Sequence, residues 1–419
     1  MQNPKLDHFL KTLGPGILFA STAIGVSHLV QSTRAGADFG FALIPFVLAA
    51  NLFKYPFFEY GSRYANATGE SIIDGYKRIG TWMLGLYFLI TLGSMFFVAA
   101  AVGAVTAGFL QNLFGISGSG MWGTGGLFAL CVGILMLGRY KILDSMIKLI
   151  GAVLLLSTLL AFILALSKGG NVPVETFVAP DIWSNESILF IIALMGWMPT
   201  AVDLSAWNSL WTIARIRQTG YHPTMKETLF DFNFGYLVST GLSMCFVTLG
   251  AYMMFGSGDE LPDSSSAFAN SVVEMFTSHV GDWSFIIIAA SSFAIMFGTC
   301  IAIFDGYARS LQRIVELISA DQGKSNERKS VYTWTLVVVG IGSFGVVFFL
   351  GSKLKELVDL ATTISFLIAP VIAVVNFRLV IGNQINPKHH PPLWLKALSW
   401  MGILFLTGFA LYFAWLKLT

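Results

Sequence analysis

The sequence predicts an all-α polytopic membrane protein with eleven transmembrane helices. Three observations lead to this prediction: an apolar composition, apolar runs about as long as a bilayer is thick, and an uneven distribution of positive charge. Of the 419 residues, 55% are hydrophobic and only 11% are charged, and the mean hydropathy is +0.72. A soluble domain carries about 25% charged residues. We therefore expect lipid to be the solvent around most of this chain.

Apolar runs of about 20 residues are long enough to cross a bilayer as helices. The predicted spans are 14–33, 40–60, 83–112, 121–138, 147–167, 187–212, 230–255, 284–308, 331–350, 356–380 and 394–416. The hydrophilic segments between them are short, so we expect one membrane domain over residues 1–419. The polar segment 1–13 lacks an apolar run before a small-residue cleavage site, so we expect no removable signal peptide.

The positive charges indicate an orientation for these helices. With the N-terminus in the cytoplasm, nineteen of the 25 Lys and Arg residues fall in predicted cytoplasmic segments and five in external ones. The remaining one, Lys54, lies within the second span. This split follows the positive-inside rule. We expect an integral protein of a bacterial inner membrane, with a cytoplasmic N-terminus and an external C-terminus.

Several classes of function find no support in the sequence. Cys131, Cys245 and Cys300 each lie in an apolar run without metal-type spacing, so we expect packing residues and neither disulfides nor metal ligands. The net charge of +2 gives no indication of a nucleic-acid partner. We find no nucleophile–base constellation, phosphate loop or H-E-x-x-H motif. We therefore expect no enzymatic activity and no cofactor.

The first span is interrupted in its middle by Gly25, Val26, Ser27 and His28. Glycine and serine lower the cost of unwinding a helix, and an ionisable His28 at mid-membrane depth is costly unless it finds partners or lines a cavity. Broken helices are tolerated in a bilayer only around protein-enclosed or water-filled sites. Gly25, Ser27 and His28 are therefore predicted to line a substrate site.

The sixth span, 187–212, contains a second interruption. Pro199 lacks a backbone donor and clashes with the preceding turn, which predicts a break near Met198 with Pro199 opening a second half-helix. Interruptions in helices one and six of eleven are typical of a five-plus-five inverted repeat with its substrate at the breaks. We expect repeats at about 14–167 and 187–380, an additional helix at about 394–416, and the two breaks facing each other near the bilayer midplane.

Three segments resemble one transporter family. They are the register from Gly14-Pro15 through Ala35-Gly36 to Phe39-Gly40, the motif at 62–71 with Arg63 and Ala67-Thr68-Gly69, and the pair Met198-Pro199. Together they resemble the Nramp divalent-metal transporters. The resemblance implies a LeuT-type fold and secondary active transport by alternating access, with a metal cation as the cargo.

The chain lacks the acidic residues with which the family binds its metal and relays protons. The first helix of the family unwinds at an Asp-Pro-Gly-Asn motif whose Asp and Asn bind the metal, but positions 25–28 hold Gly, Val, Ser and His here. The acidic pair that relays protons in the third helix of the family falls on Phe97 and Ala100. Both the compensation of the metal charge and the family's proton path are missing from these positions.

The sixth helix keeps part of the family pattern. The Met ligand of the family corresponds to Met198 and its backbone-carbonyl ligand to Met195, whereas its two His positions correspond to Thr200 and Ser205. The resemblance thus assigns Met195, Met198 and Thr200 to the substrate site.

The chemistry of these residues leaves two cargo classes open. The imidazole of His28 and the thioether of Met198 suit a softer metal and are our candidate metal ligands. The positive N-terminal ends of the half-helices near Ser27 and Pro199 favour a carboxylate or another small anion. The cargo is therefore predicted to be a metal cation bound in a modified site or, alternatively, a neutral or anionic small solute.

Other polar residues near the breaks are candidates for coupling or gating. Asp203, one turn past the second break, is a candidate to bind the cargo or couple transport to an ion, and the alternatives are that it pairs with a basic group or caps a freed backbone amide. Trp207, Asn208, Lys54 and Glu59 are gate candidates, with packing or structural pairing as the alternative interpretation. The expected partners are the lipid bilayer and a small ion or solute.

Overall fold

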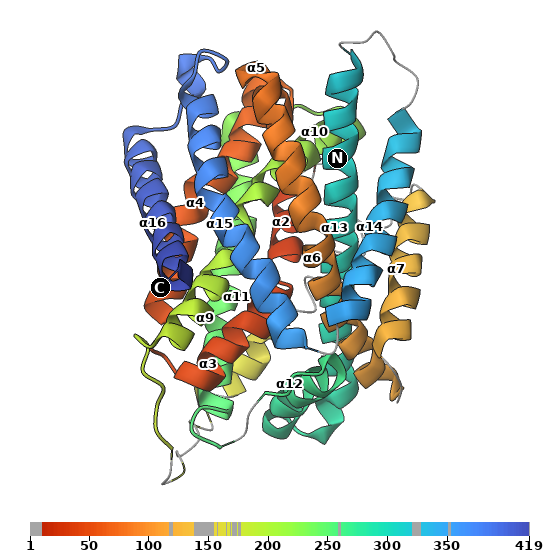
Figure 1. Ribbon diagram of the computed structural model, residues 1–419, viewed down its shortest axis with the longest axis vertical. Helices are drawn as coiled ribbons and strands as arrows, with labels where there is room; N and C mark the ends of the chain where they lie inside the picture. The colour runs from red at the N-terminus through yellow and green to blue at the C-terminus, as the bar shows by residue number, and fades with distance from the viewer. Residues whose placement is uncertain are drawn as a thin grey trace, which may run out of the picture.

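The computed structural model describes residues 11–116, 120–137, 177–258, 261–320, 328–350 and 353–418, together with scattered positions between 155 and 174. Over these residues the chain is helical and contains no strand, as the sequence predicts. The helices form an elongated bundle in which most of them run along the long axis (Figure 1). The predicted span at 147–167 lies largely outside the described residues.

The helices follow the predicted spans closely, with two of the spans divided. The elements are α2 (Pro15–Ala23), the π-helix η1 (Ser27–Ser32), α3 (Thr33–Phe39), α4 (Ile44–Thr68), α5 (Ile72–Ile79), α6 (Thr81–Phe114), α7 (Gly120–Met136), α9 (Asn185–Gly196), η2 (Val202–Leu204), α10 (Ser205–Thr219), α11 (Met225–Met253), α12 (Ser265–Val280), η3 (Asp282–Ser284), α13 (Phe285–Ala320), α14 (Arg328–Leu350), α15 (Leu354–Ile381), η4 (Pro387–His389) and α16 (Leu393–Leu418).

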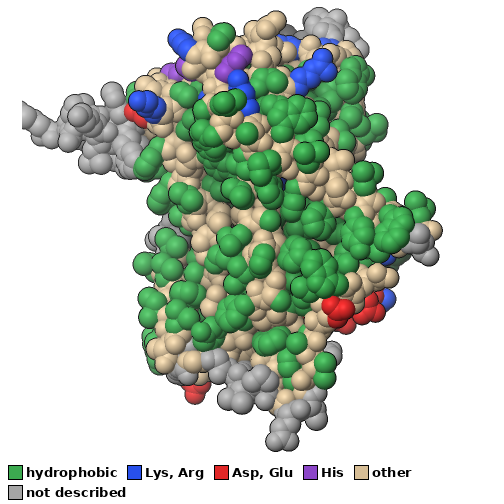
Figure 2. Space-filling view, turned by 90° about the vertical axis from the view of Figure 1, so that its left-hand side faces the viewer, with side chains coloured by type: hydrophobic (Ala, Val, Ile, Leu, Met, Phe, Trp, Pro, Cys, Tyr) green, Lys and Arg blue, Asp and Glu red, His purple; other side chains and the backbone are tan. Residues whose placement is uncertain are grey.

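The long helices have the length and apolarity of membrane spans. Within the described residues, α6, α11, α13, α14, α15 and α16 are each long and apolar enough to cross a bilayer. Figure 2 shows one side of the molecule, where hydrophobic side chains cover the middle and charged side chains lie toward the two ends. This distribution is that of an integral membrane protein, because the middle of the surface offers lipid an apolar partner.

The two divided helices lie inside the bundle. Helices α2 and α3 pack against α11, α4 packs against α10 and α11, and α9 packs against α15. Glycines allow the closest of these approaches: a Cβ on Gly16 would lie 1.9 Å from the carbonyl oxygen of Asp231, and one on Gly36 would lie 2.0 Å from that of Val247. Backbones this close hold α2 and α3 firmly against α11.

Short helices lie at the two ends of the bundle (Figure 1). At one end, which we call the α5 end, α5 begins with a capping box in which Ser71 and Asp74 satisfy each other's backbone amides. At the other, the α12 end, α12 begins at the N-cap Ser264, whose side chain accepts from the amide of Ala267. Neither α5 nor α12 is among the predicted spans, because each is too short to cross a bilayer.

Candidate functional site

The first interruption lies at the predicted place but has a different shape. Helix α2 ends at Ala23, and Ile24 and Gly25 form a turn. The chain continues at once as the π-helix η1, with the amide of Leu29 bonded to the carbonyl of Gly25 at 3.0 Å. The break is therefore a kink followed by a π-helix rather than an open unwound segment. Such π-turns are frequent at functional sites.

The second interruption is longer. Helix α9 ends at Gly196, and the chain is not helical from there until η2 begins at Val202. Pro199 lies in the middle of this stretch, so the prediction that it opens the second half-helix is wrong: α10 starts at Ser205. The reason is that Ala201 is extended (φ −68°, ψ 136°), which delays the helix beyond the proline.

The two interruptions meet inside the bundle, as the sequence predicts. The hydroxyl of Ser27 lies 3.1 Å from the carbonyl oxygen of Pro199. The side chains of Ser27, His28, Met195 and Met198 are all buried. Both breaks therefore face the interior of the protein and are closed to solvent in this conformation.

His28 is fully buried, and both of its ring nitrogens have partners in the protein. Its Nε2 lies 2.8 Å from the carbonyl oxygen of Ser239 in α11, which can only accept, so Nε2 carries the proton. Its Nδ1 lies 2.7 Å from the hydroxyl of Ser27. In this conformation the imidazole joins the first break to α11, and neither nitrogen is left to hold a metal.

Lys54 of α4 occupies the second break. It is fully buried, and its Nζ donates to three backbone carbonyls: Met195 at 2.6 Å, Gly196 at 2.8 Å and Thr200 at 3.2 Å. All three carbonyls belong to the end of α9 or to the non-helical stretch after it, and that of Met195 also accepts from the amide of Met198 at 3.3 Å. The sequence analysis named Lys54 only as a gate candidate. Its position within an apolar span was the signal that marked it for a site.

Asp203 lies in η2, directly after the second break, and is 3% exposed. Lys54 and Ser94 lie near its carboxylate, and its Oδ1 has no hydrogen-bond partner among the described residues. Its charge also interacts electrostatically with three nearby phenols, those of Tyr76, Tyr87 and Tyr307. A buried carboxylate oxygen without a partner is costly, so it marks a place where a ligand could donate.

The remaining gate candidates have packing or pairing roles. Trp207 stacks edge-on against Tyr307, with ring centroids 4.9 Å apart, and lies over Gly306, where a Cβ would be 2.3 Å from its ring. The amide of Asn208 donates to the carbonyl of Phe58 at 3.3 Å. The carboxylate of Glu59 pairs with Arg63 on the same helix at 2.5 Å. Trp207 and Asn208 thus pack against neighbouring helices, and Glu59 pairs within α4, which are contacts of the kind that the alternative interpretation describes.

An ion pair between α3 and α15 lies on the side of the breaks that faces the α12 end. The guanidinium of Arg34 in α3 donates two hydrogen bonds to Asp359 of α15, at 2.7 and 3.2 Å. The amide of Gln31 also donates to Asp359, at 2.9 Å. Arg34 lies 4.8 Å above the ring of Phe190 in α9. The second half of the first divided helix is thereby fastened to α15 and to the first half of the other.

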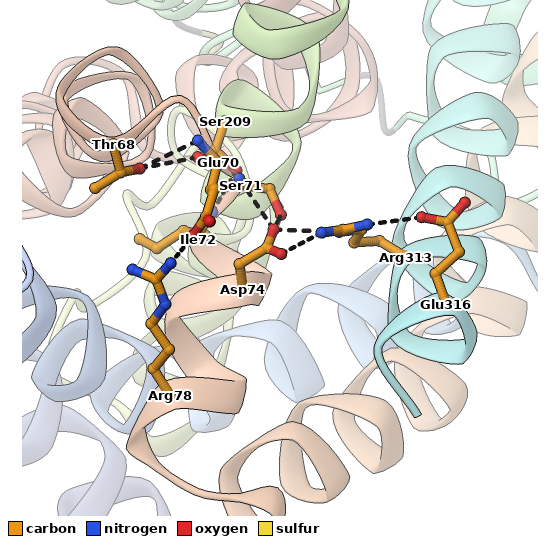
Figure 3. A network of polar contacts seen from close by, with 9 residues as sticks. All are labelled: Thr68, Glu70, Ser71, Ile72, Asp74, Arg78, Ser209, Arg313 and Glu316. Atoms are coloured by element: carbon orange, nitrogen blue, oxygen red, sulfur yellow. Dashed lines mark hydrogen bonds and ion pairs between the residues drawn. The ribbon is translucent and has the colours of Figure 1, made fainter. Parts of the chain in front are cut away.

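A second network closes the α5 end (Figure 3). Asp74 of α5 pairs with Arg313 of α13, which also donates to Glu316 at 2.8 Å. The amide of Ile72 at the start of α5 donates to Ser209 of α10 at 3.0 Å. A cavity of about 160 Å³ lies among these residues. Helix α5 therefore links the second half of the divided α9–α10 helix to α13.

No group of three or more His, Cys, Asp or Glu side chains that could hold a metal occurs among the residues that the structure describes. Of the candidate ligands, His28 has both nitrogens bonded, whereas Met198 is buried at the break. The structure brings Ser27, His28, Met195, Met198, Thr200 and Asp203 to the two breaks and adds Lys54 to them.

Comparison with known proteins identifies relatives along the whole chain. The family model of the natural resistance-associated macrophage protein-like (Nramp) proteins matches residues 16–416. The uncharacterized protein PM0681 of Pasteurella multocida is 34% identical over 405 residues, 96% of this chain and 91% of the relative. The divalent metal cation transporter MntH of Latilactobacillus sakei is 25% identical over 275 residues, 62% of this chain and 58% of that protein.

Solved structures share the fold. A mutant of the Eremococcus coleocola manganese transporter superposes with a TM-score of 0.72 at 14% identity, over 96% of this chain and 86% of the other. MhsT in complex with L-phenylalanine superposes with a TM-score of 0.60 at 14% identity, over 94% of this chain and 98% of that one. The fold is therefore the LeuT-type fold that the resemblance implied. Because the family model covers nearly all of it, the chain belongs to the Nramp family of membrane transporters.

Proposed function

We propose that this protein is a secondary active transporter that works by alternating access, with the meeting point of its two broken helices as the cargo site. The contact between Ser27 and Pro199 carries the proposal, because broken backbone inside a membrane bundle is tolerated where it lines a protein-enclosed site. The ion pairs at the two ends support it, since each can close one entrance. The two five-helix repeats at about 14–167 and 187–380 would supply the moving parts.

The residues at the breaks favour a small neutral or anionic solute as the cargo. A hard dication needs anionic oxygen ligands to offset its desolvation. The first break supplies no carboxylate, and the nitrogens of His28 are bonded to Ser27 and Ser239. Among the residues that the structure describes, Asp203 is then the single carboxylate at the breaks. Its Oδ1 is free to accept from a solute.

A metal cation is the second candidate. The family match and the similarity to MntH favour it, and the buried thioether of Met198 lies where the resemblance assigns a metal ligand. In that case the metal would be a soft one, because thioether and imidazole ligands suit soft ions. His28 would have to release Ser27 or Ser239 to bind it.

A ligand-stabilisation screen separates the two candidates. Detergent-purified protein is heated with Mn²⁺, Fe²⁺, amino acids or small anions, since a ligand at 100 times its Kd stabilises the fold by about 2.7 kcal/mol. We expect a neutral or anionic solute to raise the melting temperature and to be taken up by proteoliposomes. We expect Mn²⁺ and Fe²⁺ to bind weakly or not at all. Tight, saturable Mn²⁺ binding that Met198→Ala abolishes would establish the metal candidate instead.

A further inference from the structure

The Nζ of Lys54 lies where a cation would be expected in this fold. It is surrounded by the carbonyls of Met195, Gly196 and Thr200 at 2.6 to 3.2 Å, all from the second break. The carbonyl of Met195 is the one that the family resemblance assigns to the metal. Backbone carbonyls freed by a broken helix are the usual ligands of a small cation in such transporters. Here the protein's own side chain takes their hydrogen-bonding capacity.

The hydrogen bonds identify the charge state of Lys54. All three partners are carbonyl oxygens, which can only accept, so Nζ must supply three donors. An ammonium group has three N–H bonds and a neutral amine has two. The three acceptors around Nζ match the three N–H donors of the charged form, which is the form that this arrangement of carbonyls favours.

The surroundings balance this charge without a ligand. Lys54 is 0% exposed, so its charge cannot be met by water. The carboxylate of Asp203 lies near enough to act on it. Together, the ammonium and the carboxylate make the interior of the break electrically neutral, and Oδ1 of Asp203 still has no partner among the described residues.

We propose that Lys54 is a tethered cation that fills the cation position of the cargo site and thereby determines its specificity. This inference rests on the proposed cargo site and goes further, by naming the residue that selects the cargo. A fixed ammonium among the carbonyls excludes metal cations by occupying their ligands and by repulsion. It leaves the free oxygen of Asp203 as the acceptor for a solute without net charge that carries an N–H or O–H donor.

The proposal predicts that a small ammonium ion can replace the side chain. Lys54→Ala removes the ammonium and its stem, which leaves a space lined by the three carbonyls. We expect the purified variant to melt several degrees below the wild type. Methylammonium should restore the melting temperature saturably, because it supplies the same charge and three N–H donors. Tetramethylammonium, with the same charge and no N–H donor, should not restore it.

Two matched variants control this experiment. Lys54→Met keeps most of the volume but has no donor, so we expect it to be destabilised without responding to methylammonium. Lys388→Ala removes an exposed lysine and should melt like the wild type with or without the ion. A folded Lys54→Ala variant that does not respond to methylammonium, or that responds equally to tetramethylammonium, overturns the proposal.

The Lys54→Ala variant could fail to yield folded protein even when methylammonium is present throughout purification. In that case the proposal is tested by adding Mn²⁺ to the wild-type protein and measuring its melting temperature. Without a variant, absence of any Mn²⁺ effect on the wild-type melting temperature supports a filled cation position, and a saturable increase overturns it. These measurements follow binding and not transport. A rescued Lys54→Ala variant in a protein without uptake activity would therefore preserve this inference and refute the proposed transport function.

Discussion

At the scale of single residues, His28 shows how burial changes the role of an ionisable group. The sequence predicts that His28 lines a substrate site, where its removal would abolish uptake and cost little stability, because no packed core would be lost. In the structure both nitrogens are bonded, to Ser27 and to Ser239 of α11, and no part of the ring is exposed. His28 therefore stabilises the kink by fastening it to a neighbouring helix.

We accordingly expect His28→Ala to reduce the free energy of unfolding by about 2–4 kcal/mol, since it removes two buried hydrogen bonds and leaves a cavity. Thermal melting in detergent measures this loss. Ser239→Ala is the matched control and should cost less than about 1 kcal/mol, because the main acceptor of His28 is the backbone carbonyl. A His28→Ala protein with wild-type melting and no uptake would restore the original prediction of a cargo contact.

Asp203 is the residue at the breaks that can exchange a proton with a passing solute. Its free Oδ1 and its place directly after the second break make it the candidate for coupling. We expect Asp203→Asn to lower the melting temperature, because it removes the counter-charge of Lys54, and to remove the pH dependence of the remaining uptake, because the amide cannot ionise. Uptake by proteoliposomes over a range of external pH tests this. A pH profile like that of the wild type would exclude Asp203 as the coupling group.

At the scale of helices, the molecule is closed at both ends by pairs of Arg and carboxylate groups. Arg34 and Asp359 join α3 to α15 at the α12 end, and Arg313 and Asp74 join α13 to α5 at the other. In both pairs the guanidinium and the carboxylate form a bidentate contact, which fixes their relative orientation in addition to the attraction between the charges. They are suited to holding a helix in one of two positions.

We expect each pair to control access to the site from one side of the membrane only. Arg34→Gln is expected to open the α12 end, and Asp74→Asn the α5 end, each raising the open population about tenfold for a loss of about 1.4 kcal/mol. Thr362 of α15 is fully buried, and its carbonyl oxygen lies against Gly196 at the end of α9. Modification of a Thr362→Cys variant by a membrane-impermeant thiol reagent, added to one side of proteoliposomes at a time, reports the opening. The native cysteines are replaced beforehand.

Each variant is the control for the other, because both lose one charge from an Arg–carboxylate pair. Faster labelling from the same side in both variants would contradict a role as separate gates. Unchanged labelling in both would show that the pairs only stabilise the fold.

The two helix breaks show which features of the structure can be predicted from the local sequence and which cannot. Gly25, Ser27 and Pro199 placed both interruptions to within a few residues, since the conformational freedom of glycine and the missing donor of proline act locally. The π-helix at Ser27–Ser32 and the delayed start of α10 were not predicted. Residues far away in the chain contact both segments: His28 in the π-helix bonds to Ser239, and Lys54 bonds to the carbonyls of the second break.

At the scale of the whole molecule, reporter proteins fused to the C-terminus test the predicted orientation. The positive charges of the sequence favour a cytoplasmic N-terminus and an external C-terminus, and with an odd number of spans the termini must lie on opposite sides. We expect alkaline phosphatase fused after residue 419 to be active in a bacterial host, and green fluorescent protein at the same place to be dark. A fluorescent C-terminal fusion would require an even number of spans or the opposite orientation.

The sequence by itself determined the membrane class, the order of the long helices, the positions of both breaks and the family. Each of these depends on composition, on apolar length or on residues that act on their own backbone. Only the tertiary structure decided what each polar side chain does. Lys54 is 141 residues before the carbonyl of Met195 that it contacts, and His28 is 211 residues from Ser239. Partners so far apart in the chain are chosen by how the helices pack, and no local pattern records that choice.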